Sequence, residues 1–179
     1  MTPTPAPDPA ADGALLAGID AVFDHAAHAA RRIRDLLPLY GDLLGGRFRT
    51  GGDNQRAGYR VVQLGFHDGT KVELMEPLAG SSFFDGFFAG RPAGGLHHLT
   101  FTVPDITAAL RRVEELGLTA TGVNFENPGW QELFVHPRLA HGALIQLAQP
   151  GPNPWGVAGF TLEDVLAGRG PGGDGRPSP

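Results

Sequence analysis

The stretch GGLHHLTFTVPDITAALRRVEELGL, residues 94–118, predicts a β-strand that is followed at once by an α-helix. Apolar and polar side chains alternate over residues 96–103, which is typical of a half-buried strand. From Ile106 onward, apolar side chains recur at intervals of three and four positions, and Gly117 supplies a stop signal for the helix. This strand and helix therefore set the pattern against which the rest of the chain can be compared.

The first half of the chain repeats the same order of elements. A weaker strand pattern covers residues 21–29, and a helical pattern covers residues 32–46, in which Pro38 predicts a kink or a later start. Each half then continues with two or three segments that we expect to be antiparallel strands, among them YRVVQLGF and KVELMEPL in the first half and QELFVHP and ALIQLAQ in the second. The sequence thus predicts two pseudo-symmetric modules.

Composition sets the boundaries of the predicted parts. Short helices are expected near Phe83–Phe88 and after Thr161, which is a plausible N-cap with Asp164 three positions later. Tails rich in Pro, Ala and Gly are expected to be disordered. The predicted parts are a disordered tail at residues 1–19, one domain at residues 20–150 with modules 20–80 and 94–150, and a C-terminal extension at residues 151–179 that is mostly disordered after residue 168.

Composition also narrows the classes of function. The chain has 179 residues, of which 41% are hydrophobic, so we expect one globular domain with its own core. A net charge of −5 gives no reason to expect a nucleic-acid partner. No apolar run approaches the roughly 20 residues that span a bilayer, and no signal peptide is recognisable, so a cytoplasmic protein without a membrane partner is predicted. Because there is no cysteine, a metal would be bound by histidine, carboxylate, amide or water.

Strand alternation separates the two adjacent histidines of residues 96–103. His97 shares a face with Leu99 and Phe101, whereas His98 shares the other face with Thr100. Because the first face is apolar, we expect His97 to pack beneath the helix. His98 is then expected to face the region that the sheet encloses.

The closing strand of each module places a polar side chain among apolar neighbours. Glu73 in KVELMEPL and Gln146 in ALIQLAQ alternate with apolar residues, which is costly unless they face a polar site or water. Glu73 lies 48 positions after His25, and Gln146 lies 48 positions after His98. Equal separations place these groups in equivalent positions of two modules. Two imidazoles and two oxygen donors predict one divalent metal ion, with Co, Ni, Mn, Zn or Fe as candidates.

The same stretches resemble the vicinal oxygen chelate superfamily, whose members consist of paired βαβββ modules. The resemblance covers about residues 22–149 and is carried by FDH, VELMEPL, GGLHHLTFTVPDI, FVHP and GALIQLAQ, which are most similar to methylmalonyl-CoA epimerases and next to glyoxalase I. It implies an α+β fold in which two βαβββ modules form a curved, partly open, barrel-like sheet around a metal site. It further implies a homodimer, and the metal ligands His25, Glu73, His98 and Gln146.

Two departures from the epimerase pattern bear on the expected reaction. The last ligand position is usually Glu in both named relatives, and here it is Gln146, which is neutral and cannot act as a base. The epimerases also have an acidic residue after the first helix, whose counterpart here falls near Arg56, where there is no carboxylate. We therefore expect a metal-dependent isomerase, epimerase or lyase with Glu73 as the base, and a proton transfer confined to one face of a small keto or acyl substrate.

Two other functions stay open. His25, His98 and Glu73 also form the two-histidine, one-carboxylate set of non-haem Fe(II) oxygenases, although the carboxylate of the related dioxygenases comes from the last strand. A non-enzymatic binding protein, like the bleomycin-binding members of the superfamily, is disfavoured because such proteins generally lack the four ligands. The remaining candidates are residues that could line the substrate site: His141, Trp130 and Glu126, the last as a second acid.

Overall fold

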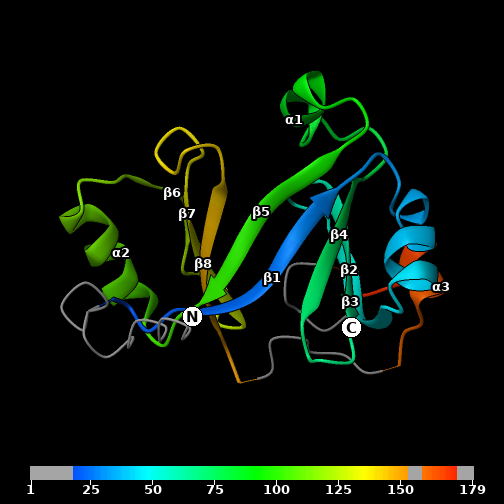
Figure 1. Ribbon diagram of the computed structural model, residues 1–179, viewed down its shortest axis with the longest axis horizontal. Helices are drawn as coiled ribbons and strands as arrows, with labels where there is room; N and C mark the ends of the chain where they lie inside the picture. Colours follow the sequence, from blue (N-terminus) through cyan, green and yellow to red (C-terminus); the bar gives the residue numbers. More distant parts are fainter. Residues whose placement is uncertain (1–17, 153–158, 173–179) are drawn as a thin grey trace, which may run out of the picture.

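Eight strands form one curved sheet in the order β2-β3-β4-β1-β5-β8-β7-β6 (Figure 1). The computed structural model describes residues 18–152 and 159–172. In this part of the chain no helix is long and apolar enough to cross a membrane. The strands are β1 (Val22–Ala29), β2 (Arg47–Asn54), β3 (Tyr59–Gly65), β4 (Lys71–Pro77), β5 (Gly95–Thr102), β6 (Ala120–Asn124), β7 (Trp130–Val135) and β8 (Leu144–Pro150).

The sheet has an approximate two-fold symmetry about the contact between its central strands, β1 and β5. These two strands are antiparallel, and each pairs in parallel with the last strand of its own module, β1 with β4 and β5 with β8. The remaining strands continue outward as antiparallel neighbours. The predicted α+β fold with a curved, partly open sheet is confirmed, and one inner face is shared by both modules.

Helical segments cover the outer face of the sheet. In the second module, α2 (Ile106–Glu115) buries Ile106, Ala109 and Val113 against Leu133 and other residues of β7 and β8. The side chain of its N-cap, Asp105, accepts a hydrogen bond from the backbone N–H of residue 108. The buried face of the helix follows from the helical spacing of its apolar residues, and aspartate is a favoured residue at an N-cap.

In the first module, Pro38 divides the predicted helix into two short segments. These are a 3₁₀ turn, η2 (Ile33–Asp35), and a π-helix, η3 (Pro38–Leu43). The C-terminal helix α3 (Leu162–Leu166) lies beside them and adds Val165 to the same apolar cluster (Figure 1). The extension therefore covers part of the outer face that the interrupted helix leaves open.

The described part of the C-terminal extension contains the expected helix and continues to residue 172. The expected cap of α3 is present, since the Thr161 hydroxyl accepts from the Asp164 N–H and the Asp164 carboxylate accepts from the Thr161 N–H. Beyond residue 168, the Asp53 N–H donates to Pro171 O at 2.9 Å, and Gly172 forms a parallel bridge with Asp53. Predicted disorder at residues 1–17 and 173–179 lies outside the described residues, as does the segment 153–158.

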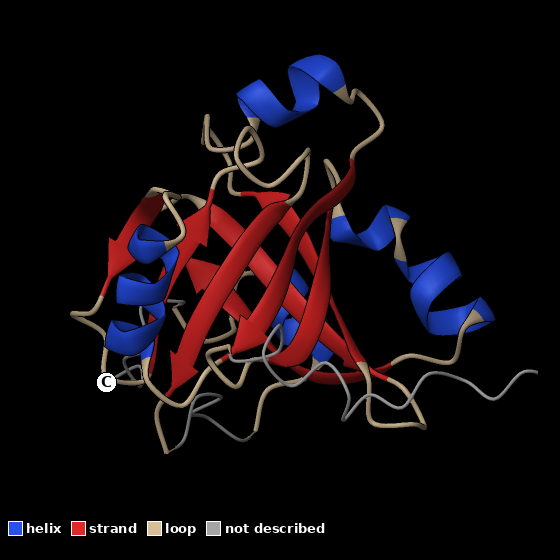
Figure 2. Cartoon of the chain, turned by 60° about the vertical axis from the view of Figure 1, so that its left-hand side comes forward, coloured by secondary structure: helices blue, strands red, loops and turns tan. Residues whose placement is uncertain are grey.

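A third apolar cluster lies on the inner face and closes one end of it. The helix α1 (Asp85–Gly90), close to the position predicted between the modules, extends across the end of the curled sheet (Figure 2). Phe84 and Phe88 pack there with Ala27, Ala29 and Met75. The inner face is therefore apolar at the α1 end and polar further along β1 and β5.

Candidate metal centre

Three of the four predicted ligands meet on the inner face of the sheet. His25 on β1, Glu73 on β4 and His98 on β5 each offer one ligand atom, and these atoms lie within 4.8 Å of one another. Glu73 Oε2 lies 3.7 Å from His25 Nε2, and Glu73 Oε1 lies 3.8 Å from His98 Nε2. Ala27 is the cross-strand partner of both Glu73 and His98, so a small side chain separates these two donors.

The state of His98 fits a metal ion. Its Nε2 is buried and, among the described residues, has no hydrogen-bond partner. Burial, together with the neighbouring charges of His97 and His25, holds the pKa of His98 well below its usual value. A buried, neutral nitrogen without a partner is costly unless a ligand satisfies it. Two imidazole nitrogens and a carboxylate at this spacing are a donor set that divalent metals accept.

Each histidine is oriented by the residue that precedes it. The pairing register of β1 and β5 shifts at Asp24 and at His97, so each is the extra residue of a β-bulge. Asp24 Oδ2 lies 2.6 Å from His25 Nδ1, and His97 Nδ1 lies 2.9 Å from His98 Nδ1. Burial acts to raise the pKa of Asp24, but its hydrogen bonds with His25 and Lys71 outweigh burial and lower it. With Nδ1 engaged in this way, the Nε2 atoms of both histidines face Glu73, and His25 Nε2 also contacts the Thr100 hydroxyl at 3.1 Å.

The bulge also corrects the prediction for His97. Its side chain does not pack beneath α2; it lies on the same side as His98, where it contacts Phe84 and Phe87 at ring-centroid distances of 5.3 and 5.1 Å. Strand alternation fails here because a bulge adds one residue to one strand. Burial, aided by the charge of Arg91, lowers the pKa of His97 to about 4.

Gln146, the fourth predicted ligand, lies beside the other three and is connected to them through Thr100. The Thr100 hydroxyl donates to Gln146 Oε1 at 2.5 Å and lies 3.1 Å from His25 Nε2. The Gln146 Nε2 donates to Glu132 Oε2 at 2.5 Å. Both Thr100 and Gln146 are buried. The structure thus brings Gln146 to the edge of the cluster, with its amide engaged in hydrogen bonds.

Two polar residues that the sequence analysis does not single out complete this face. Gln63 on β3 donates to Glu73 Oε2 at 3.2 Å. Glu132 on β7 accepts from Trp130 Nε1 at 3.0 Å as well as from Gln146. Burial raises the pKa of Glu132, its two hydrogen bonds oppose this, and the charge of Glu73 raises it further. Alternation within WQELFV places Glu132 opposite the buried apolar residues, and this signal could have identified it.

The three predicted substrate residues have different surroundings. Trp130 is partly buried and contacts Glu132 on the inner face. Glu126 has an 87% exposed side chain and lies 3.9 Å from Arg56. His141 is exposed in a turn before β8 and has a φ of 51°. The structure therefore brings only Trp130 towards the cluster and leaves the other two at the surface.

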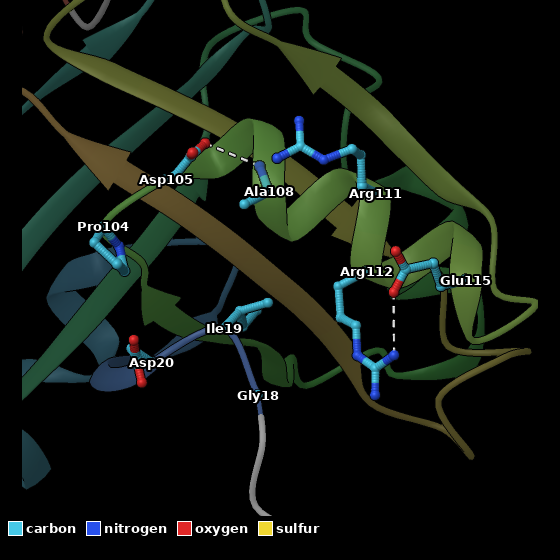
Figure 3. Close-up of a pocket in the computed structure, with 9 residues that line it drawn as sticks. All are labelled: Gly18, Ile19, Asp20, Pro104, Asp105, Ala108, Arg111, Arg112 and Glu115. Atoms are coloured by element: carbon cyan, nitrogen blue, oxygen red, sulfur yellow. Dashed lines mark hydrogen bonds and ion pairs between the residues drawn. The ribbon is translucent and has the colours of Figure 1, made fainter.

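A cavity of about 620 Å³ lies elsewhere, beside α2 (Figure 3). Within it, Arg112 donates to Glu115 at 3.1 Å, an exposed pair on the helix surface. None of its lining residues belongs to the histidine and glutamate cluster; they are Gly18, Ile19, Asp20, Pro104, Asp105, Ala108, Arg111, Arg112 and Glu115.

Comparisons with known proteins agree with this arrangement. Residues 24–134 match the model of the glyoxalase/bleomycin resistance protein/dioxygenase superfamily. The chain belongs to this superfamily. The predicted superfamily membership is therefore confirmed.

Similar members of the superfamily include several epimerases. The ethylmalonyl-CoA/methylmalonyl-CoA epimerase of Cereibacter sphaeroides is 33% identical over 130 residues, which cover 71% of this chain and 96% of that one. The human mitochondrial methylmalonyl-CoA epimerase is 28% identical over 129 residues, covering 71% and 73% of the two chains. The crystal structure of methylmalonyl-CoA epimerase from Mycobacterium tuberculosis is 28% identical, has a TM-score of 0.65, and is matched over 73% of this chain and 89% of that one. These relatives support an enzyme of the epimerase type.

Proposed function

We propose that this protein is a metal-dependent epimerase of acyl thioesters that carry an acidic α-proton, of the methylmalonyl-CoA type. The observation that carries the proposal is the buried group His25, Glu73 and His98, in which His98 Nε2 has no partner among the described residues. Relatives named as epimerases of such thioesters match 71% of the chain. The span that matches the superfamily model, residues 24–134, contains all three residues.

In this proposal, His25 Nε2, His98 Nε2 and a carboxylate oxygen of Glu73 hold one divalent ion, with the Gln146 amide as a fourth ligand. Co, Ni, Mn, Zn and Fe all suit such nitrogen and oxygen donors. A bound ion of this kind supplies Lewis acidity, which polarises the thioester carbonyl and stabilises the charge formed when the α-proton leaves. Glu73 accepts that proton, because it is the only carboxylate among the four residues.

The proposal includes a homodimer that acts on a small molecule in the cytoplasm. Large apolar side chains are exposed on the two central strands, and such residues are frequent where subunits meet. These are Val22 (64% exposed), Phe23 (48%) and Leu96 (57%). Light scattering on the purified protein tests the dimer independently of activity.

The reaction is tested with single enantiomers of methylmalonyl-CoA in D₂O. Protein stripped of metal by a chelator is expected neither to exchange the α-proton nor to invert the carbon. Addition of Co²⁺ is expected to restore both, as followed by NMR and by a stereospecific coupled assay. Stripped protein that is as active as loaded protein, or loaded protein that exchanges no α-proton, would contradict the proposal.

One alternative is favoured by a specific observation, since two histidines and one carboxylate are also the ligand set of non-haem Fe(II) oxygenases. An oxygenase requires iron and consumes O₂, whereas the epimerase works anaerobically with Co²⁺. Oxygen uptake with Fe²⁺ and an aromatic or keto substrate, together with inactivity of the Co²⁺ form, would favour the alternative.

A further inference from the structure

The symmetry of the sheet relates Glu73 to Gln146. Glu73 on β4 lies opposite Ala27 of β1, and Gln146 on β8 lies opposite Thr100 of β5. Equivalent positions of the two modules therefore carry a carboxylate in the first and a neutral amide in the second. At this position only the first module provides a group that can exchange a proton with a substrate.

The same symmetry relates Glu132 to Val61. Glu132 on β7 lies opposite Ala148 of β8, and Val61 on β3 lies opposite Met75 of β4. Ala148 lies two positions after Gln146 on β8, and Met75 lies two positions after Glu73 on β4. Here the second module provides the carboxylate, and the first has an apolar side chain. Glu73 and Glu132 thus come from opposite modules and from non-equivalent strands.

The setting of Glu132 is that of a positioned acid. Its side chain is partly buried, and Oε2 accepts hydrogen bonds from Gln146 Nε2 and Trp130 Nε1. These two donors fix the plane of the carboxylate on the inner face. Through Gln146 and Thr100, a continuous chain of hydrogen bonds joins Glu132 to His25.

Inversion of a carbon requires proton removal from one face and proton delivery to the other. We propose that Glu132 is the second acid–base group of this site, acting on the face of the substrate carbon opposite to Glu73; this inference rests on the proposed epimerase function. In one direction Glu73 takes the α-proton, and the C–H electron pair moves into the thioester carbonyl. The pair then returns to the α-carbon and forms a new C–H bond with the proton of Glu132, whose O–H bond breaks. Glu73 then holds the proton and Glu132 is ionised, so exchange with solvent restores both groups.

The test uses the metal-loaded Glu132→Gln protein with each enantiomer of methylmalonyl-CoA in D₂O. Glutamine keeps an oxygen that accepts from Gln146 and Trp130, so the fold and the metal content are expected to stay unchanged. Inversion is expected to fall about 10²- to 10⁴-fold, the usual contribution of one acid–base group. Deuterium is expected to enter one enantiomer with retention of configuration, because Glu73 still serves its own face. Exposed Glu114→Gln, on α2, is the matched control and keeps wild-type inversion.

The outcomes separate this inference from the function on which it rests. Wild-type inversion by Glu132→Gln would overturn the role of Glu132 and leave the epimerase intact. Equal loss of exchange from both enantiomers, with metal still bound, would also overturn it, since a group that only supports the site affects both faces alike. Absence of exchange and inversion in the wild type would overturn the proposed function, and with it this inference.

Discussion

Asp24 and His97 occupy equivalent bulges, and each contacts the Nδ1 of the histidine that follows it, at 2.6 Å in the first module and 2.9 Å in the second. The symmetry thus extends beyond the proposed ligands to the residues that contact them. One module uses a carboxylate for this purpose and the other an imidazole. Outer partners of this kind set the direction and basicity of a metal-bound histidine.

Replacement of Asp24 is therefore expected to weaken metal binding. Asp24→Ala removes the partner of His25 Nδ1, and a loss of about 10- to 100-fold in Co²⁺ affinity is expected, with unchanged stoichiometry. Asp42→Ala, at an exposed position of η3, is the control. Calorimetric titration of both proteins measures the effect. Equal affinities would show that the bulge contact does not support the site.

Thr100→Val is expected to destabilise the metal-free protein. Thr100 is fully buried, and its hydroxyl donates to Gln146 Oε1 beside His25 Nε2, so valine leaves a buried acceptor without its donor. The expected loss in the free energy of unfolding is about 1–3 kcal/mol. Thr102→Val, on the same strand but more exposed, is expected to change stability by less than about 0.5 kcal/mol. Urea unfolding of both variants measures these changes. A similar loss in the free energy of unfolding for Thr100→Val and Thr102→Val would contradict the prediction.

The aromatic surroundings of His97 predict a pH-dependent stability in the metal-free protein. Folding lowers the pKa of His97 from 6.5 to about 4, so the folded state binds this proton more weakly than the unfolded state. The contribution is fully present above pH 6.5 and is lost as the pH falls towards 4, by up to about 3 kcal/mol. His97→Phe is expected to reduce the loss seen between pH 7 and pH 4.5, whereas exposed His67→Gln is not. Parallel stability curves for wild type and His97→Phe would contradict the prediction.

Arg60 supports the first module beneath the C-terminal extension. Its guanidinium contacts Asp53 at 2.6 Å and Glu76 at 3.1 Å, and donates to Leu166 O at 3.0 Å. Arg60→Met leaves two largely buried carboxylates without their cation, and a loss of about 3–5 kcal/mol is expected in the free energy of unfolding. Arg32→Met breaks an exposed pair with Asp35, and its effect on the free energy of unfolding is expected to be much smaller, because solvent screens exposed charges. A similar cost for both substitutions, measured by urea unfolding, would show that the buried network contributes little.

Most of the candidate site can be predicted from the sequence, because the internal repeat corresponds to equivalent strand pairing in the two modules. The equal spacing from His25 to Glu73 and from His98 to Gln146 corresponds to equivalent registers around the two central strands. The Thr161 cap and the split at Pro38 are likewise local effects, and local chemistry is visible in a sequence. These features need no knowledge of distant contacts.

Other features depend on contacts that the sequence does not reveal. The bulge at His97 changes the face of one side chain, and strand alternation gives the wrong result there. Glu132 stands where the two modules differ, so no repeat marks it, and only the alternation within β7 indicates that it faces away from the buried apolar residues. Strands β2 and β6 lie at the edges of the sheet and contain glycine, so pairing with β3 and β7 defines them better than any apolar pattern.

Titration of the chelator-stripped protein with Co²⁺ tests the shared centre most directly. The wild type is expected to bind one ion per chain and to develop the visible absorption of a cobalt site with nitrogen and oxygen ligands. His98→Ala, which removes the buried Nε2 that lacks a partner in the described part of the chain, is expected to bind more than about 100-fold more weakly. Equal stoichiometry and affinity in the two proteins, or no binding by the wild type, would contradict the account.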